Sequence, residues 1–227
     1  MIGNEVLTAK VRDRNTPVLL EGLTEAGVRV LEVALLPDVV DRIAAVVRDF
    51  SRRFDFVVTT GGVGPTHDDR TWQAVAQALD LPLVEQPDLL RLLESRAPGP
   101  LTAEQRRLAL LPAGTELVGA DGRWPMLRVR NVVVLPGVPA LVASRVPRLQ
   151  ELYGNAKPHV ATASFAVDEW LVVAAIDAVV ADFGDLEIGS YPIDDDPDCR
   201  LRLTFEGFDR ARVDAAVAAA ADRIGRP

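Results

Sequence analysis

Residues 59–69 read Thr-Thr-Gly-Gly-Val-Gly-Pro-Thr-His-Asp-Asp and hold three glycines within four positions. They follow a short apolar run, residues 54–60, typical of a strand buried on both faces, and precede a helical pattern over residues 69–79. Open α/β sheets bind ligands at such strand-to-helix turns. Dense glycines let backbone N–H groups approach an anion, and a helix N-terminus adds partial positive charge. The stretch therefore predicts an anion-binding loop.

The side chains of this loop are of two kinds. Thr60 and Thr66 carry hydroxyl groups that can donate to a phosphate, whereas Asp68 and Asp69 would repel one and suit a bridging metal or proton transfer. A structural alternative stays open, in which an aspartate caps the next helix and the glycines only form a tight turn. The loop is neither a Walker A motif nor a dinucleotide-binding fingerprint, so its spacing alone does not name the ligand.

Strand-like and helix-like patterns alternate through the first half of the chain, which predicts an α/β fold with a doubly wound, mostly parallel sheet. Only Met1 and Ile2 precede a turn at Gly3-Asn4-Glu5, so we expect the first strand to be truncated and the true start to lie upstream. The expected strands cover residues 28–36, 54–60 and 131–135, and the expected helices begin at Thr16, Pro37, Asp69, Pro87, Thr102 and Pro139. Residues 118–130 are expected to be irregular.

Two domains are predicted, residues 1–153 and residues 159–227. The segment between them contains Gly154, Asn155 and Pro158, which are typical of a linker. Beyond it the patterns run strand, helix, strand, strand, helix, which predicts a small α+β domain. Residues 155–227 hold 14 Asp/Glu and 7 Lys/Arg, so this part carries most of the net charge of −8 and is a poor partner for nucleic acid.

Composition excludes several classes of protein. No apolar run approaches the ~18 residues that span a bilayer, so no membrane partner is expected and the cytoplasm is the default location. The single cysteine, Cys199, and the two distant histidines, His67 and His159, argue against zinc, haem or iron–sulfur centres. Any metal should be Mg²⁺-like and held by carboxylates and phosphates.

Several motifs together resemble the molybdopterin-binding (MoaB/Mog-like) domain of molybdenum-cofactor biosynthesis proteins. The resemblance extends over nearly the whole chain and is greatest for the branch that contains competence/damage-inducible protein A and the N-terminal domain of FAD synthases, including its short stand-alone relatives. The motifs are Gly3-Asn4-Glu5-Val6-Leu7, Asp13, Asn15, Pro37-Asp38, the stretch from Thr60 to Thr71, and Leu135-Pro136-Gly137-Val138-Pro139.

The resemblance implies a three-layer α/β domain, a KH-like C-terminal domain, and a ligand such as molybdopterin, ADP-ribose or FAD. It also implies that Asp38 and Asp69 act in catalysis, with Asp68 as a further candidate, and that Asp68 and Asp69 hold Mg²⁺. Asn4 departs from the aspartate common in the family, which removes one possible metal ligand. The expected ligand-binding residues are Gly3, Glu5, Thr60, Gly61, Gly62, Val63, Gly64, Pro65, Thr66, Pro136 and Gly137.

Three functions remain open from the sequence. The first is a metal-dependent nucleotide pyrophosphatase, the second a non-catalytic molybdopterin- or nucleotide-binding module, and the third an oligomeric scaffold. A homo-oligomer is expected, because small α/β domains with apolar faces often form symmetric assemblies. Glu5, Asp13 and Asn15 either line the pocket or serve as caps and turn residues.

Overall fold

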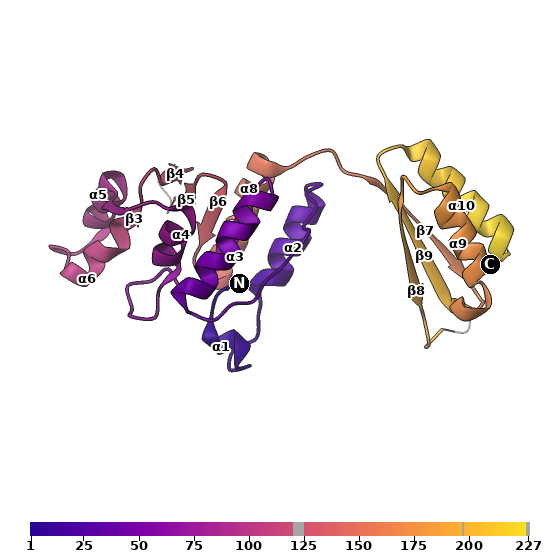
Figure 1. The fold of residues 1–227 in the computed structure, drawn as a ribbon, viewed down its shortest axis with the longest axis horizontal. Helices are drawn as coiled ribbons and strands as arrows, with labels where there is room; N and C mark the ends of the chain where they lie inside the picture. Colours follow the sequence, from indigo (N-terminus) through magenta and orange to yellow (C-terminus); the bar gives the residue numbers. More distant parts are fainter. Residues whose placement is uncertain (120–124, 197, 226–227) are drawn as a thin grey trace. The chain divides into compact units, whose positions relative to one another are not determined.

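The computed structural model describes residues 1–119, 125–196 and 198–225. The chain separates into two compact units, Met1–Gly154 and Asn155–Pro227, and each has its own helices and sheet (Figure 1). Among the described residues, no helix is long and apolar enough to cross a membrane.

A mixed four-stranded sheet forms the centre of the first unit. Its strand order is β1 (Val57–Thr60), β6 (Val132–Leu135), β5 (Met126–Val129) and β4 (Glu116–Val118). β1 and β6 are parallel, while β6, β5 and β4 pair antiparallel. All four residues of β6 are buried, as expected for a strand covered on both faces.

Helices cover both faces of this sheet, so the unit has three layers. Side chains alternate along a strand, and in β6 Val132 and Val134 pack with α3 (Val40–Arg53) and α4 (Thr71–Leu79). The intervening side chains, Val133 and Leu135, face the opposite way. They pack with α2 (Asn15–Glu25), α7 (Pro139–Ala143) and α8 (Val146–Tyr153). The predicted α/β class is confirmed.

A small antiparallel pair, β2 (Leu83–Glu85) and β3 (Leu110–Pro112), extends this unit. Leu89, Ala109 and Leu111 are buried there against Leu127 of β5. The remaining elements here are α5 (Pro87–Arg96), α6 (Ala103–Arg106) and the 3-10 turn η1 (Arg107–Ala109).

Some sequence-based expectations for this unit were wrong. Residues 28–36 form no strand, and a parallel bridge joins Leu36 to Ile2. The physical reason is that, among the described residues, no strand pairs with them along their length. Residues 118–130, expected to be irregular, include β5, and residues 120–124 lie outside the described part of the chain.

Other differences concern where helices begin. A short helix, α1 (Asn4–Leu7), replaces the expected turn at Gly3-Asn4-Glu5. α2 begins at Asn15, one residue before the expected Thr16, and the carboxylate of Asp13 accepts from the N–H groups of Asn15 (2.9 Å) and Thr16 (3.0 Å). α3 begins three residues after Pro37, because Val39 is extended.

The second unit is a small α+β structure. Its antiparallel sheet has the order β7 (His159–Phe165), β9 (Leu201–Gly207) and β8 (Glu187–Pro192). Leu201, Leu203 and Phe205 alternate along β9 and are fully buried. The helical elements are η2 (Glu169–Leu171), α9 (Val173–Asp182) and α10 (Arg210–Ile224), and both longer helices pack on this face of the sheet. The KH-like topology remains a prediction.

Candidate functional site

Three chain segments end side by side at one edge of the first unit's sheet. The Ile2 N–H donates to the Thr60 carbonyl (2.9 Å), and the Gly61 N–H donates to the Leu135 carbonyl (3.2 Å). Gly137 lies two residues after Leu135, the end of β6. A Cβ built on Gly137 would lie 3.3 Å from the Gly61 Cα. The backbones of residues 2–3, 60–61 and 136–137 therefore meet where a parallel sheet usually binds its ligand.

Gly61 and Gly62 must be glycines because the backbones of these segments approach each other closely. Gly61 has φ 101°, and a Cβ on it would lie 2.1 Å from the Ile2 carbonyl oxygen. Gly62 has φ 64°, and its Cβ would lie 2.6 Å from the Thr71 Oγ1. A side chain at either position would collide with fixed neighbours in a left-handed backbone conformation. Packing between strand ends thus explains part of the glycine content without a ligand.

Thr71 fixes the backbone of these glycines. Its buried hydroxyl donates to the Gly61 carbonyl (2.7 Å), and its N–H donates to the Gly62 carbonyl (2.9 Å). Thr71 is also the first residue of α4, so the loop is joined to the start of that helix. Sequence reasoning did not propose Thr71 as a site residue; its position at the end of the Gly-rich motif was the available signal.

The two neighbouring acids fold back on the loop itself. The Thr66 N–H donates to the Asp69 Oδ2 (2.9 Å), and the Thr66 hydroxyl donates to carboxylate oxygens of both Asp68 (2.6 Å) and Asp69. The bond from the Thr66 hydroxyl is the main cause that lowers the pKa of Asp68. The structural alternative, in which an aspartate caps the next helix, is not what the structure shows, because Arg70 precedes α4 and no side chain caps it; the two carboxylates instead close the turn on Thr66.

Asp38 lies on the other side of the glycines. Its Oδ2 accepts from the Asn4 N–H (2.8 Å), and its Oδ1 lies 3.5 Å from the position of a Cβ built on Gly62. A Cβ built on Gly64 would lie 2.6 Å from the Asp69 Oδ2. The loop is thus bordered by one carboxylate near Gly62 and another near Gly64.

The acids do not form a ready-made metal cluster. Within the described ranges, no group of three or more Asp, Glu, His or Cys side chains is arranged to hold a metal ion. Mg²⁺ commonly uses only one or two protein carboxylates and takes its other ligands from water and phosphates. Asp68 and Asp69 as metal ligands remain a prediction.

Other predicted binding residues differ in their surroundings. Val63 is partly buried against the core, while Gly64, Pro65 and Thr66 are exposed. The Glu5 carboxylate lies close over Gly3, with its Oε1 2.6 Å from the position of a Cβ on that glycine. The Pro136 carbonyl accepts from the Thr60 hydroxyl (2.8 Å), so Thr60 holds the loop and its hydroxyl is not turned outward as a free donor.

Asn15 connects the strand ends from the start of α2. It is 3% exposed, and its Nδ2 donates to the Gly137 carbonyl (2.8 Å) and the Thr60 Oγ1 (3.1 Å). Within the described part of the chain its Oδ1 is buried without a hydrogen-bond partner. The side chain therefore holds two site segments together and offers one unused acceptor.

We expect Asn15→Leu to lower the free energy of unfolding of the first unit by about 1–3 kcal/mol, because the Gly137 carbonyl loses a buried donor. Urea unfolding measures this change. Asn155→Leu, at an exposed linker position, is the control and should shift stability by less than about 0.5 kcal/mol. Equal stability of both variants would contradict a tethering role for Asn15.

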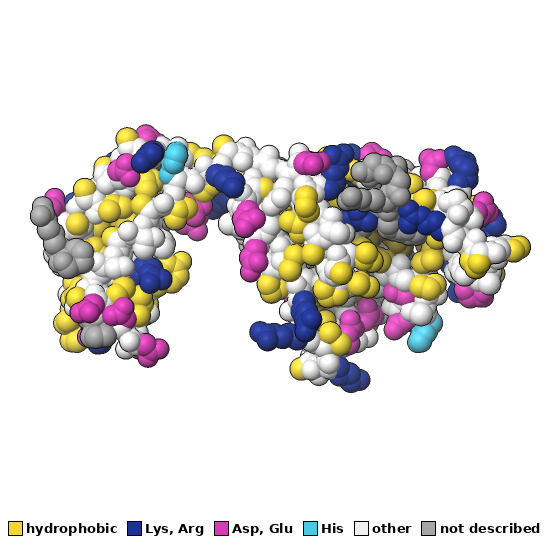
Figure 2. All heavy atoms as spheres, turned by 180° about the vertical axis from the view of Figure 1, so that it is seen from behind, with side chains coloured by type: hydrophobic (Ala, Val, Ile, Leu, Met, Phe, Trp, Pro, Cys, Tyr) yellow, Lys and Arg dark blue, Asp and Glu magenta, His cyan; other side chains and the backbone are white. Residues whose placement is uncertain are grey.

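Basic side chains near α1 were missed by the sequence reasoning. Lys10, Arg12 and Arg14 are exposed in the segment between α1, which contains Glu5, and α2, which begins at Asn15. Figure 2 shows basic side chains on the projection at the lower edge of this unit, the end at which Figure 1 draws α1. The signal in the sequence was the presence of three positive charges within residues 10–14.

Residues 1–149 match the family described as a probable molybdopterin binding domain. The chain belongs to this family. Residues 157–226 match the family described as the middle domain of FAD synthase. The predicted family resemblance is confirmed for both parts of the chain.

Individual relatives agree with this assignment. A protein of Archaeoglobus fulgidus is 33% identical over 217 residues, which cover 95% of this chain and 92% of the relative. A probable FAD synthase of Caenorhabditis elegans is 28% identical and aligns with 96% of this chain, which spans only 47% of that relative. The crystal structure of the protein CinA, of unknown function, from Thermoplasma acidophilum superposes with a TM-score of 0.59 at 26% identity, covering 66% of this chain and 93% of that one.

Proposed function

We propose that residues 61–66, together with Gly137, bind the pyrophosphate of a molybdopterin- or adenine-nucleotide-type ligand. The observation that carries the proposal is the convergence of three glycine-containing strand ends at one edge of the sheet. Glycine backbones at the carboxyl ends of strands, followed by a helix N-terminus, suit the binding of phosphate groups. Membership of a family described as probable molybdopterin binding supports the same class of ligand.

Charge around the loop is compatible with an anion. Lys10, Arg12 and Arg14 are exposed in the segment next to the site and would attract a phosphate. Asp38 and Asp69 would oppose it unless a cation came with the ligand. Mg²⁺ bound between the ligand phosphates and these two carboxylates would offset that repulsion.

The finer proposal is hydrolysis of a pyrophosphate such as that of ADP-ribose or FAD. Water attacks one phosphorus, the bridging P–O bond breaks, and two phosphomonoesters are released. Asp69 is the proposed group that positions the attacking water, and Asp38 would help to hold the Mg²⁺ that accompanies the phosphates. Binding energy from the glycine backbones would keep the pyrophosphate in place during the attack.

We expect Asp69→Asn to reduce Mg²⁺-dependent hydrolysis of ADP-ribose and FAD by about 100-fold or more, the usual size of a lost acid–base or water-positioning group. The amide keeps an oxygen that can accept from Thr66, so the loop should stay folded and the Kd for ADP-ribose should change by less than about threefold. Chromatography of the products measures the hydrolysis rate, and calorimetric titration measures the Kd.

Asp80→Asn is the matched control for this experiment. Asp80 is an exposed C-cap in the left-handed conformation, which asparagine also tolerates, and it lies outside the loop. It should leave both hydrolysis and binding unchanged. Equal hydrolysis rates for Asp69→Asn and the parent would remove Asp69 from catalysis.

A non-catalytic binding module is the second candidate function. It is favoured by the engagement of Asp68 and Asp69 with Thr66, and by Asn4 at a position where the family commonly has an acid. Binding of ADP-ribose or FAD without turnover, at any Mg²⁺ concentration, would favour the module. The homo-oligomeric state stays a prediction, and gel filtration with light scattering tests it.

A further inference from the structure

The second unit's sheet ends in a long strand, β7, that pairs on one side only. In the order β7, β9, β8, the only neighbour of β7 among the described strands is β9 (Figure 1). Its register with β9 runs one residue to one, without interruption, from His159 to Phe165. A regular edge strand of seven residues is a template on which another strand can pair.

Three residues of β7 direct their backbone groups toward the unpaired side. The Phe165 carbonyl accepts from the Arg200 N–H (2.9 Å), next to the start of β9, so Phe165 faces β9. Successive residues of a strand direct their N–H and C=O groups to opposite sides. The groups of Val160, Thr162 and Ser164 therefore point away from β9, where no described strand lies beside them.

β7 lacks the features that usually protect a strand edge. Natural sheets protect their edges with charged side chains, proline, bulges or a covering segment. The sequence of β7, His-Val-Ala-Thr-Ala-Ser-Phe, contains no proline and no Asp, Glu, Lys or Arg. Residues 155–227 nevertheless hold 14 Asp/Glu and 7 Lys/Arg, so this uncharged edge belongs to an acidic unit.

The opposite edge of the same sheet has this protection. β8 begins at the charged Glu187 and ends at Pro192, which has no N–H to donate. The Ser190 hydroxyl donates to the Glu169 carboxylate, which holds η2 beside this strand. The two edges of one small sheet therefore differ, and β7 is the edge that is left open to pairing.

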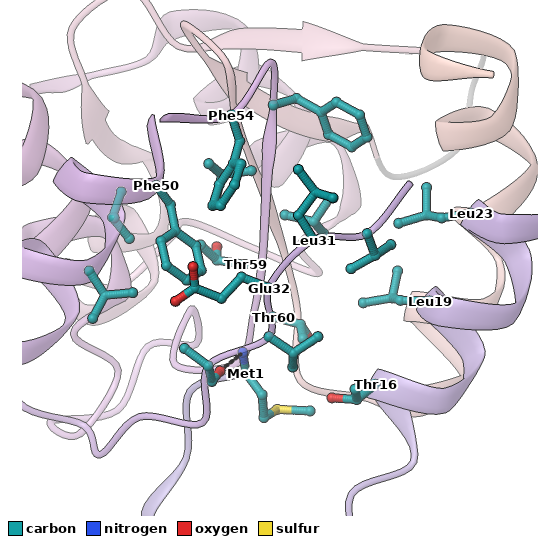
Figure 3. Close-up of a pocket in the computed structure, with 18 of the residues that line it drawn as sticks. Met1, Thr16, Leu19, Leu23, Leu31, Glu32, Phe50, Phe54, Thr59 and Thr60 are labelled. Atoms are coloured by element: carbon teal, nitrogen blue, oxygen red, sulfur yellow. Dashed lines mark hydrogen bonds between the residues drawn. The ribbon is translucent and has the colours of Figure 1, made fainter. Parts of the chain in front are cut away.

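The outer side of β1 in the first unit differs from β7 as well. A cavity of about 220 Å³ lies beside this strand, and residues 28–34 line it together with Thr59 and Thr60 (Figure 3). The Thr60 carbonyl accepts from the Ile2 N–H (2.9 Å). Segments of the same chain thus lie along that edge, whereas no described strand pairs with the free side of β7.

Two copies of β7 are complementary to each other in an antiparallel arrangement. Thr162 is the middle residue of the strand, and Val160 and Ser164 lie symmetrically about it. A two-fold axis at Thr162 would pair this residue with Thr162 of the second copy, and Val160 with Ser164 of the second copy. All the outward N–H and C=O groups would then be bonded, and the two strands would overlap along their whole length.

The side chains of β7 are compatible with this pairing. On the face covered by the helices, Ala161 would lie opposite Ala163 of the second copy, and these small side chains, already packed on the unit's core, would not collide. On the other face the opposed side chains are threonine, valine and serine, and β-branched and hydroxyl side chains form favourable cross-strand pairs. No like charges within the two strands would be brought together.

We propose that β7 is the interface through which two copies of this chain form a dimer, by joining their sheets edge to edge into one antiparallel sheet. Two-fold symmetry is the commonest symmetry of soluble homo-oligomers. An extended segment of a different protein would need no symmetry about Thr162, whereas the outward residues of β7 have it. The inference is independent of the ligand proposed for residues 61–66.

Thr162→Lys in the full chain tests this interface, because it places two lysines against each other at the axis. The parent chain should dimerise reversibly between about 1 µM and 1 mM in sedimentation equilibrium. The variant should raise the dimer Kd at least about 100-fold, since opposed like charges across an interface are strongly disfavoured. Sodium chloride at about 1 M should recover part of this loss by screening the repulsion.

Val180→Lys is the matched control. It adds the same charge at an exposed position of α9, outside the sheet, and should change the dimer Kd by less than about threefold. A parent chain that stays monomeric throughout the concentration range would overturn the proposal. A dimer that Thr162→Lys leaves intact would also overturn it.

Amide hydrogen exchange of the parent chain gives a second readout, which does not depend on a substitution. The amides of Thr162 and Ser164 should exchange at least about tenfold more slowly in concentrated than in dilute protein. The Ala163 amide faces β9 and should exchange equally slowly in both. Protection of Thr162 that does not depend on concentration would mean that another segment of the same chain covers this edge, and the proposal would be wrong.

Discussion

Replacing Gly61 by alanine is expected to destabilise the first unit by about 4 kcal/mol and to abolish ligand binding by residues 61–66. The new methyl group would lie 2.1 Å from the Ile2 carbonyl oxygen, in a backbone with φ 101°. The left-handed conformation costs a non-glycine residue about 1–3 kcal/mol, and overpacking costs a similar amount. Urea unfolding monitored by circular dichroism measures the loss of stability.

Gly114→Ala separates the two causes of this loss. Gly114 has φ 82°, close to that of Gly61, but a Cβ built on it would meet nothing within 4 Å. It should therefore show only the conformational part, about 1–3 kcal/mol. If Gly61→Ala cost no more than Gly114→Ala, the close approach of Ile2 to the loop would be wrong.

Phe205→Ala is expected to destabilise the second unit by about 3–5 kcal/mol, because it removes a fully buried ring from the centre of β9. The ring packs in a core made entirely of residues from the second unit. Ligand binding by the first unit should therefore persist in the variant. Differential scanning calorimetry and titration with ADP-ribose measure the two effects.

Val160→Ala is the control in the same sheet. Val160 is 61% exposed in β7, so its truncation should cost less than about 0.5 kcal/mol. A loss of ADP-ribose binding in Phe205→Ala that is absent from Val160→Ala would show that the first unit depends on the folding of the second. That outcome would contradict the separation of the two hydrophobic cores.

Local patterns predicted the elements whose partners are near in sequence or whose signal is strong. α5 begins at Pro87, as expected from the proline. α10 is the last helix in the predicted order and follows a capping aspartate, Asp209. The buried run of β6 was also found, because an all-apolar strand is covered on both faces. These features depend on a few neighbouring residues.

The expected strand at residues 28–36 shows where such reasoning stops. Its apolar pattern is right for a strand, but a strand also needs a partner along its length, and the pairing here is limited to the bridge at Leu36. Strand pairing depends on segments that are distant in the sequence, so the β-propensity of residues 28–36 alone cannot predict it.

The candidate site was predicted in its location and only partly in its detail. The loop at residues 61–69 and the second turn at Gly137 were expected, and the structure brings them together with Asp38. The roles of Thr60 and Thr71 as internal tethers, made through bonds to Pro136 and Gly61, could not be predicted, because each depends on which carbonyl lies within reach. Patterns reveal residue types, whereas hydrogen-bond partners follow from the folded geometry.

We propose that backbone groups at the ends of β1 and β6 bind a pyrophosphate. This binding can be tested by titrating the isotope-labelled protein with ADP-ribose and following the NMR shifts of the backbone amides. We expect the largest shifts at Gly61, Gly62, Gly64, Thr66 and Gly137. Shifts confined to residues elsewhere, or none at saturating ADP-ribose, FAD and molybdopterin, would contradict it.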